Sequence, residues 1–385
     1  MNADVLVIGA SPAGLMAARN ASSGGADVKL LDKKPEIGTS THPANTFFKS
    51  MIDKTGEEVD QSYVIKKLNG AHIISPSGNY VSVKSAGFFI DRSKFDTYYA
   101  EQVRNTGVDI RTDVEAYNVI KSGDFFVVST SQGTFRAKVV VVADGIKSYI
   151  ARLLGLNPVK YPDDIAWAME AEIESEGIGK PDMFEYYLGN VAPGWKSTYS
   201  PCGGNRATLG VYVRRHGRDV SGFFNNWVEN FKKSKGLNDL KILDTKTGGD
   251  PIACIPDEIV SDGIMVVGGA AGQSGIGYGM RAGQIAGDVA AEALSKNDVS
   301  KSVLSQYRKI WNKEFRAEYY LGRIALETLR KMNDDEIDDM MKSFEGKDLS
   351  FIKGNPLNQA MQIGMYLLRN NPKSLLSYRA LLRNR

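Results

Sequence analysis

A glycine-rich hexapeptide near the start of the chain has the residue types and spacing that bind phosphate. Gly9-Ala10-Ser11-Pro12-Ala13-Gly14 follows an apolar run and precedes a helical pattern. Gly9 would permit a tight turn, Gly14 would let helix and strand approach, and amide groups at the helix N-terminus could bind a pyrophosphate. Ser11 stands where a second glycine is usual, so its side chain narrows the approach, although its hydroxyl could also donate to phosphate. The pattern predicts a dinucleotide site.

An acidic residue follows at the distance that such a site requires. Asp32 ends the apolar run 27–32 (DVKLLD), where a carboxylate can accept hydrogen bonds from ribose hydroxyls. Lys33, the next residue, is assigned to the same site. The alternative is a tight turn between strand and helix that binds no ligand.

These residues need a βαβ unit to position them, with strands at 4–9 and 27–32 around a helix at 15–21. Long alternating strands from 165 to 213 then predict an antiparallel sheet. The expected fold class is α/β: a Rossmann-like domain, an inserted mixed or antiparallel β-sheet substrate domain, and a C-terminal helical region. The expected boundaries are 1–160 (with part of the substrate sheet near 65–90), 161–258, 259–297 for the return to the first domain, and 298–385.

Composition excludes several classes of protein. The formal charge of the 385 residues is +3, so no global field favours nucleic acid as a partner. Cys202 and Cys254 are the two cysteines and lie far apart, which argues against a disulfide framework, a zinc site or a redox dithiol. No apolar run reaches the roughly 18 residues that span a bilayer. We expect a cytoplasmic protein.

The C-terminal tail has an uneven charge. After Asp348 there are no acidic residues, whereas six residues are basic: Lys353, Arg369, Lys373, Arg379, Arg383 and Arg385. Apolar residues between them would make an amphipathic, cationic segment that can lie on anionic lipid. Peripheral membrane contact is one interpretation, and a terminal helix pair packed on its own protein is the other.

Three further segments resemble a known family of flavoproteins. Val139–Arg152 contains the Ala-Asp-Gly of flavoproteins similar to p-hydroxybenzoate hydroxylase. Arg92-Ser-Lys-Phe-Asp96 resembles the Arg-x-x-Phe-Asp of one branch, the geranylgeranyl reductase family. Gly263–Leu294 is similar to the strand, loop and helix that close the flavin site there, and Tyr307–Arg330 resembles the family's helical tail. The resemblance covers essentially the whole chain.

The resemblance implies FAD as the cofactor and the saturation of isolated C=C bonds in an isoprenoid lipid as the reaction. Arg92 would reach the cofactor, although a salt bridge at the helix start is the alternative. The electron donor, reduced ferredoxin or NAD(P)H, stays open. The residues assigned to FAD are Gly9, Ser11, Ala13, Gly14, Asp32, Lys33, Arg92, Ala116, Asp144, Gly145, Gly269, Gly275 and Ile276.

The sequence departs from the family at the flavin end. The family's Gly-Asp-Ala becomes Gly268-Gly269-Ala270, its Arg-Cys-Gly-x-Gly loop becomes His42–Thr46, and its Tyr-x-Trp-x-Phe-Pro strand is matched only loosely by Pro193–Pro201. Trp195 and Tyr199 would line an apolar cavity or belong to the core. The proton donor is unassigned, with His42 and Tyr199 as candidates.

Three other functions stay open on the sequence alone. A flavin monooxygenase is one, because Asp144-Gly145 is shared with aromatic hydroxylases. An electron-transfer flavoprotein that reduces a quinone is the second. The third is a flavin- or lipid-binding protein without turnover, because the loops near the flavin are altered.

Overall fold

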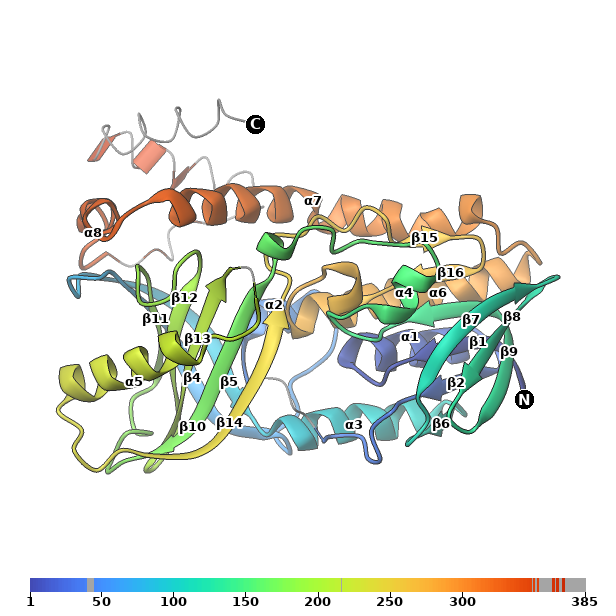
Figure 1. The fold of residues 1–385 in the computed structure, drawn as a ribbon, viewed down its shortest axis with the longest axis horizontal. Helices are drawn as coiled ribbons and strands as arrows, with labels where there is room; N and C mark the ends of the chain where they lie inside the picture. Colours follow the sequence, from blue (N-terminus) through green and yellow to red (C-terminus); the bar gives the residue numbers. More distant parts are fainter. Residues whose placement is uncertain are drawn as a thin grey trace.

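A computed structural model describes residues 1–39, 45–215 and 217–347, together with 349, 352, 362, 363, 365, 366, 369 and 370. The strands of this part form two eight-stranded sheets. The sheets occupy opposite ends of an elongated molecule, and the long helix α7 (Lys301–Lys331) runs along both of them (Figure 1).

The first sheet is built around a parallel centre in the order β15-β16-β9-β1-β2-β6. β1 is parallel to both β2 and β9, and its run of valine, leucine and isoleucine is buried on both faces. β7 and β8 extend this sheet through antiparallel pairing with β9. The strands are β1 (Asn2–Ile8), β2 (Val28–Leu31), β6 (Asp109–Arg111), β7 (Ala116–Ser122), β8 (Phe125–Thr130), β9 (Gly133–Val142), β15 (Val260–Ser261) and β16 (Ile264–Val266).

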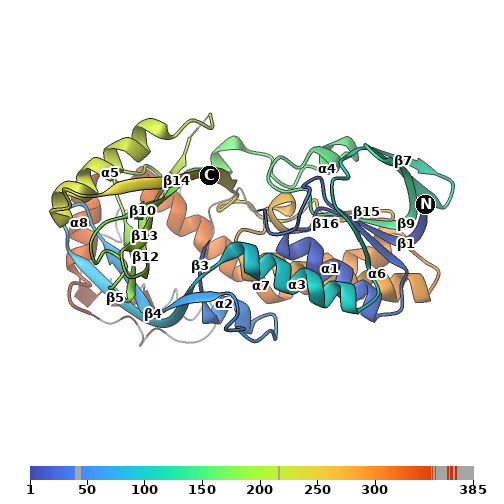
Figure 2. The ribbon, with the colours of Figure 1, turned by 90° about the horizontal axis from the view of Figure 1, so that it is seen from below.

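A layer of helices covers one face of this sheet: α1 (Pro12–Ser23), α3 (Arg92–Asn105), α6 (Ile276–Ser295) and part of α7 (Figure 2). Small residues bring α1 and α6 into backbone contact. A Cβ atom on Gly283 would lie 2.0 Å from the carbonyl oxygen of Ala13, and one on Gly287 would lie 2.5 Å from that of Ala17. The C-terminal part of the chain therefore supports the first helix of the βαβ unit.

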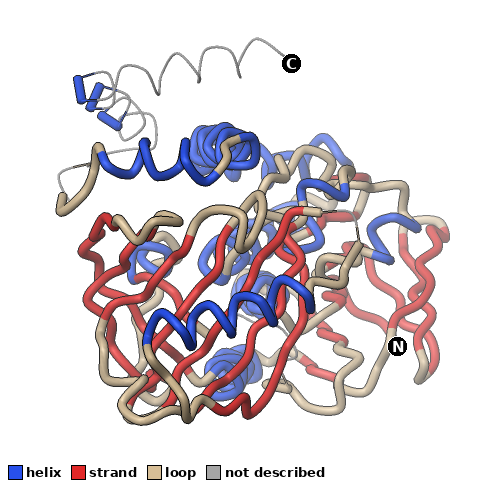
Figure 3. Tube along the Cα trace, turned by 60° about the vertical axis from the view of Figure 1, so that its left-hand side comes forward, coloured by secondary structure: helices blue, strands red, loops and turns tan. Residues whose placement is uncertain are grey.

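The second sheet has the order β14-β10-β13-β12-β11-β4-β5-β3 and is antiparallel except where β11 pairs with β4. Helix α5 (Ser221–Lys235) crosses one face of it (Figure 3) and buries Phe224, Trp227 and Phe231 against the strands. The strands are β3 (Thr46–Phe48), β4 (Val64–Ile74), β5 (Tyr80–Ile90), β10 (Ala166–Glu174), β11 (Met183–Tyr187), β12 (Lys196–Gly203), β13 (Arg206–Arg214) and β14 (Lys241–Asp250).

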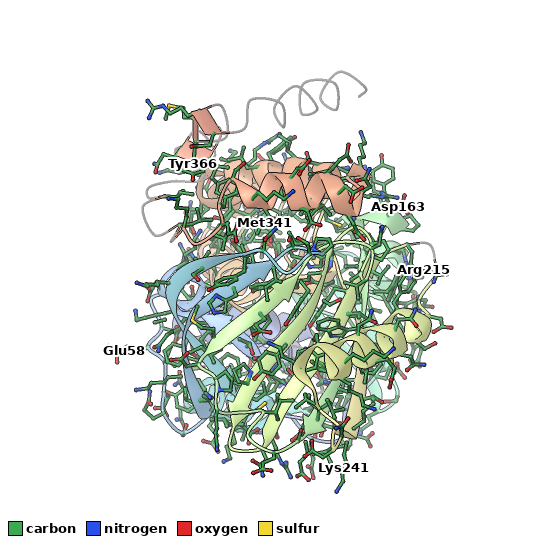
Figure 4. All side chains as sticks on the ribbon, turned by 90° about the vertical axis from the view of Figure 1, so that its left-hand side faces the viewer. Glu58, Asp163, Arg215, Lys241, Met341 and Tyr366 are labelled. Carbon is green, nitrogen blue, oxygen red and sulfur yellow. The ribbon has the colours of Figure 1, made fainter. Side chains whose placement is uncertain are left out.

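Short helices complete the described chain: α2 (Lys49–Asp53), α4 (Tyr149–Leu153) and α8 (Asp334–Lys342), with 3-10 turns η1 (Pro162–Asp164) and η2 (Gly268–Ala271). Figure 4 views the molecule from the end that carries the second sheet. Met341 of α8 lies above the strands in this view and packs with Val81 of β5. In the described part of the chain, no helix is both long and apolar enough to cross a membrane.

The expected α/β class, with a Rossmann-like first sheet and a largely antiparallel second sheet, is confirmed. The exact domain boundaries stay a prediction. The chain enters the second sheet at β3, leaves it after β5 and returns at β10. Most of the basic tail, Lys353, Lys373, Arg379, Arg383 and Arg385 included, lies outside the described residues.

A buried arginine joins the second sheet to α7. Arg214 at the end of β13 donates to Glu327 at 2.7 Å and to the Asp163 carbonyl oxygen at 2.7 Å, and its side chain is fully buried. Because a charge pair that loses one buried partner leaves the other uncompensated, we expect Arg214→Met to cost about 3 kcal/mol of unfolding free energy. Urea denaturation checks this. The control Arg206→Met removes an exposed ion pair with Glu172 and should cost less than about 1 kcal/mol.

Candidate functional site

The turn after β1 brings strand, helix and a neighbouring loop into close contact. Gly9 has a φ of +105°, and a Cβ atom there would lie 2.4 Å from the Ala143 carbonyl oxygen. A Cβ atom on Gly14 would lie 1.9 Å from the Gly9 carbonyl oxygen. Only glycine fits at either position. The two glycines therefore let β1, α1 and the turn after β9 meet backbone to backbone, and we call this turn at the N-terminus of α1 the cradle.

Ser11 caps this helix rather than blocking the cradle. Its Oγ accepts a hydrogen bond from the Gly14 amide at 3.3 Å, which leaves its own O–H free to donate to an anion. Pro12 carries no N–H, so the amide of Ala13 is the first of α1 that can serve a phosphate. The expected roles of Ser11 and Ala13 are compatible with this geometry.

The carboxylate of Asp32 is held in place at the end of β2. Its Oδ2 accepts from the Ala10 amide at 2.6 Å, and its Oδ1 accepts from the Lys34 amide at 2.8 Å. The Val114 amide donates to the Asp32 carbonyl oxygen at 2.9 Å, which places the start of β7, and Ala116 with it, beside the same strand end. Each carboxylate oxygen keeps a lone pair for a ribose hydroxyl. Lys33 is exposed next to it.

Asp144 and Gly145 form the turn after β9, next to the glycine-rich turn. Asp144 Oδ2 accepts from the Ile150 amide at 2.8 Å, whereas its buried Oδ1 has no hydrogen-bond partner among the described residues. Burial raises the pKa of the Asp144 carboxyl. An orphaned buried oxygen beside a phosphate cradle fits a site that a ligand completes. Gly269 adjoins this turn, because its Cβ atom would lie 3.5 Å from the Ile146 amide nitrogen.

The N-terminus of α6 forms the next wall. Gly275, with a φ of +98°, precedes the buried Ile276, and a Cβ atom on Gly277 would lie 2.3 Å from the Met51 carbonyl oxygen. α6 therefore begins directly against α2. The positive end of the helix dipole favours negative charge in front of it.

A buried network fixes the loop that leads into α6. Gln273 Oε1 accepts from the Gly268 amide at 2.8 Å, and Gln273 Nε2 donates to the Tyr307 hydroxyl at 2.7 Å. The Tyr307 hydroxyl in turn donates to the Val266 carbonyl oxygen at 2.9 Å. Helix α7 therefore holds the loop and β16 in one arrangement.

Arg92 makes the contact that its alternative interpretation predicts. Its Nε donates to Asp96 Oδ1 at 2.9 Å, four residues along α3, and both side chains are largely buried. Burial raises the pKa of Asp96, and the charge of Arg92 opposes this shift. Because Nε already donates to Asp96, only the terminal guanidinium nitrogens of Arg92 could contact the cofactor. That contact stays a prediction.

Neither candidate proton donor is placed at the site. His42 lies outside the described residues. Tyr199 points to the face of the second sheet that α5 covers, where it stacks on Phe231 with ring centroids 5.3 Å apart and donates to the Ile178 carbonyl oxygen. This position confirms the alternative that Tyr199 belongs to the core, and it corrects the expectation that Tyr199 supplies a proton. Its hydroxyl is committed on the wrong side of the sheet.

We expect Tyr199→Phe to leave the turnover rate within about twofold of wild type, because the lost hydrogen bond lies in the core under α5. The same substitution should lower stability by about 1 kcal/mol. Steady-state kinetics and thermal denaturation on one preparation check both. A loss of turnover without a loss of stability would instead indicate that Tyr199 takes part in catalysis.

The opposite face of the second sheet carries charged residues that the sequence analysis did not single out. Glu170, Lys196 and Asp250 lie on β10, β12 and β14, and Tyr212 of β13 stands between the first two. The Tyr212 hydroxyl donates to Glu170 Oε2 at 3.2 Å. The sequence does contain a signal for this face. Trp167, Met169 and Ala171 alternate along β10 and pack toward α5, so the residues between them, Glu170 included, must point to the opposite face.

Two hydrogen bonds join this polar face to the segments near the glycine-rich turn. Thr46 Oγ1 and Ser200 Oγ lie 2.8 Å apart, and Ser274 Oγ donates to Asp250 immediately before Gly275. Burial raises the pKa of Glu170 to about 7 and lowers that of Lys196 to about 8. Burial also raises the pKa of Asp250. The polar face of the second sheet is thus in contact with the residue that leads into α6. No group of metal-binding side chains occurs among the residues that the structure describes.

The sequence and the fold are similar to those of known proteins. Residues 6–152 match a family model described as pyridine nucleotide-disulphide oxidoreductase. The chain is 32% identical to digeranylgeranylglycerophospholipid reductase 1 of Methanothermobacter thermautotrophicus, over 97% of this chain and 96% of the relative. The solved structure of a geranylgeranyl bacteriochlorophyll reductase-like protein from Thermoplasma acidophilum has a TM-score of 0.87 at 25% identity and covers 99% of each chain. A flavin-dependent brominase shares the fold, with a TM-score of 0.68 at 18% identity over 94% of this chain and 99% of its own.

Proposed function

The chain belongs to the digeranylgeranylglycerophospholipid reductase family, and we propose on this basis that it reduces isolated C=C bonds of isoprenoid, geranylgeranyl-type lipids. It is an FAD-dependent oxidoreductase, as the motifs predicted. The observation that carries the proposal is similarity along nearly the full length of a named reductase, second sheet included. The fold alone is also found in a brominase, so the fold does not separate a reductase from a monooxygenase.

We propose that the cradle between β1 and α1 holds the FAD pyrophosphate, with Asp32 on the ribose. Gly9 and Gly14 support this because no side chain fits there, and the orphaned oxygen of Asp144 supports a ligand beside them. The other proposed contacts are Ser11, Ala13, Lys33, Arg92, Ala116, Gly145, Gly269, Gly275 and Ile276.

Bound FAD would supply the two electrons as a hydride. The chain itself must hold the lipid alkene between the sheets, exclude water and provide one proton, because an isolated alkene is otherwise unreactive. The loop that Gln273 and Tyr307 fix and Thr46 at the start of β3 would lie on two sides of this space.

Anaerobic stopped-flow spectroscopy tests the proposal. Enzyme reduced with dithionite is mixed with digeranylgeranylglycerophospholipid in detergent micelles, and reappearance of the oxidised flavin absorbance is recorded. We expect reoxidation that depends on the lipid and is absent with the fully saturated analogue. Equal rates with both lipids would contradict the proposal.

We also propose that electrons arrive from a separate donor, reduced ferredoxin or NAD(P)H, and that the basic C-terminal tail attracts anionic lipid. The six basic residues after Asp348, with no acidic residue among them, support the second point. Flotation with vesicles containing phosphatidylglycerol, compared with phosphatidylcholine alone, tests it: binding to both or to neither would contradict it.

A further inference from the structure

Lys196 and Glu170 occupy a position that the FAD site and the core do not explain. They lie on the face of the second sheet opposite α5. Lys196 of β12 is directly across from Tyr212 of β13, and Glu170 of β10 is a diagonal neighbour of Tyr212, two residues along from its partner Ala168. Most sheet faces buried in a protein are apolar, and a buried charge is costly unless it is paired. No described carboxylate lies within ion-pair distance of the Lys196 ammonium.

Aromatic rings, in place of acceptors, surround that ammonium. Lys196 Nζ lies 4.4 Å from the ring centroid of Tyr186, 5.1 Å from that of Tyr212 and 5.1 Å from that of Trp195. These contacts hold a cation while leaving its three N–H donors without a described acceptor. The rings thus hold the Lys196 ammonium in place, and its N–H groups can donate to another molecule.

Glu170 is similarly poised. Its side chain is buried, its Oε2 accepts from the Tyr212 hydroxyl, and its cross-strand partners are Gly210 on β13 and Lys246 on β14. Glycine is required at position 210, because a Cβ atom there would lie 2.7 Å from Thr198 Oγ1 and 3.4 Å from Glu170 Oε2. A carboxyl in such a place can hold a proton at neutral pH.

The wall is fastened to both segments that border the cofactor cradle. Ser274, which donates to Asp250, directly precedes the first residues of α6, and Thr46 is in hydrogen-bond contact with Ser200, four residues from Lys196 on the same strand and face. The titratable face is therefore joined through Asp250 to the residue that precedes Gly275 and α6.

We propose that Glu170 is the acid that protonates the substrate alkene and that Lys196 sustains its protonation, an assignment that rests on the proposed reductase function. The Glu170 O–H bond breaks, and the proton forms a C–H bond with one alkene carbon. The other alkene carbon receives the hydride from reduced FAD, and the two π electrons enter the new C–H bond to the proton. The Glu170 carboxylate regains its proton from solvent, with Lys196 as the relay through a bridging water, because the two groups lie beyond direct ion-pair distance.

The direction of the pH dependence follows from the surroundings. Burial raises the pKa of Glu170 to about 7, and burial lowers that of Lys196 to about 8. The other titratable or charged groups that interact with the pair are Tyr186, Cys202, Tyr212, Lys246 and Asp250. The acid form of Glu170 is lost as pH rises through about 7, so alkene reduction should be fast below this pH and fall above it.

The test is anaerobic single-turnover reoxidation of the reduced holoenzyme by saturating digeranylgeranylglycerophospholipid, from pH 5 to 9. Glu170→Gln keeps the shape and should slow reoxidation at least roughly 100-fold at pH 5 to 6, where wild type is fast, and should remove the fall in rate above pH 7. Glu170→Asp should recover part of the rate. The matched control is Glu172→Gln, on the same strand and face but exposed and paired with Arg206, which should keep the wild-type rate and pH profile.

An infrared titration reads the same assignment without turnover. The wild-type minus Glu170→Gln difference spectrum should contain a carboxylic acid C=O band that disappears near pH 7. A band already absent at pH 5 would overturn the assignment. Flavin absorbance and lipid binding must be retained in Glu170→Gln, and rates within threefold of wild type would overturn the assignment while leaving the reductase function standing.

Lys196→Met separates proton supply from lipid binding. We expect a slower rate at saturating lipid with unchanged lipid affinity. Weaker affinity with an unchanged saturated rate would overturn the role of Lys196, because it would then bind a polar group of the substrate. If wild type itself is not reoxidised by the lipid while oxidised by other acceptors, the reductase function fails and this proposal fails with it.

Discussion

Gly14→Val abolishes FAD binding while leaving the second sheet folded: this is the expected result with the largest effect. A Cβ atom at Gly14 would lie 1.9 Å from the Gly9 carbonyl oxygen, so α1 must move away from the turn that holds the pyrophosphate. We expect the purified variant to lack flavin absorbance and to bind added FAD at least about 100-fold more weakly.

Flavin absorbance of the purified protein and titration with FAD make this measurement. Gly222→Ala is the control, because it lies in α5 with open space around its Cβ position and should retain FAD fully. Circular dichroism on both variants separates loss of the site from loss of the fold. A Gly14→Val variant that keeps FAD at wild-type affinity would refute the cradle.

Asp32→Ala is the second large effect. The carboxylate orders the turn through the Ala10 and Lys34 amides and is placed to accept from the ribose. Its loss removes charge-assisted hydrogen bonds worth about 1.5–3 kcal/mol each, so FAD affinity should fall by roughly 10- to 1,000-fold. Isothermal titration with FAD and with FMN, which lacks the adenosine ribose, makes the comparison.

The comparison with FMN decides what the loss means. If Asp32 serves the ribose, the substitution should weaken FAD and spare whatever weak affinity the protein has for FMN. Asp4→Ala, which removes an exposed carboxylate near the other end of β1, is the control and should change neither affinity. An equal loss for FAD and FMN would mean that Asp32 acts only by ordering the turn.

The adenosine end of the site was predictable from sequence because its geometry is local. Gly9, Gly14 and Asp32 lie within one βαβ unit, and their spacing is dictated by a turn, a helix and a strand. The family-specific segments extended this prediction to FAD and to the fold. Both follow from patterns that lie along the chain.

The polar wall was not predictable in the same way, because it depends on register between strands that are far apart in sequence. Lys196 and Glu170 meet through β13, and no local pattern specifies that pairing. The prediction that Tyr199 donates a proton was wrong for a related reason: successive side chains of a strand point to opposite faces of the sheet. Its predicted role belonged to the face occupied by Lys196, Thr198 and Ser200.

Gly269, which replaces the aspartate of the family's Gly-Asp-Ala motif, also distinguishes the flavin end of the site from the adenosine end. The family's carboxylate is missing there, while a Cβ atom at Gly269 would meet only ordinary contacts, 3.5 Å or more from the turn after β9. The flavin end thus has room for a side chain that the adenosine end excludes. The polar face of the second sheet borders the same end.

The most direct test of the reductase function is analysis of the lipid itself after a single anaerobic turnover. Reduced enzyme is incubated with digeranylgeranylglycerophospholipid in heavy water, and the extracted lipid is analysed by mass spectrometry. We predict a product with one saturated C=C bond that carries solvent-derived deuterium on carbon. Unchanged lipid recovered from an enzyme that readily passes its electrons to oxygen or a quinone would contradict the central claim.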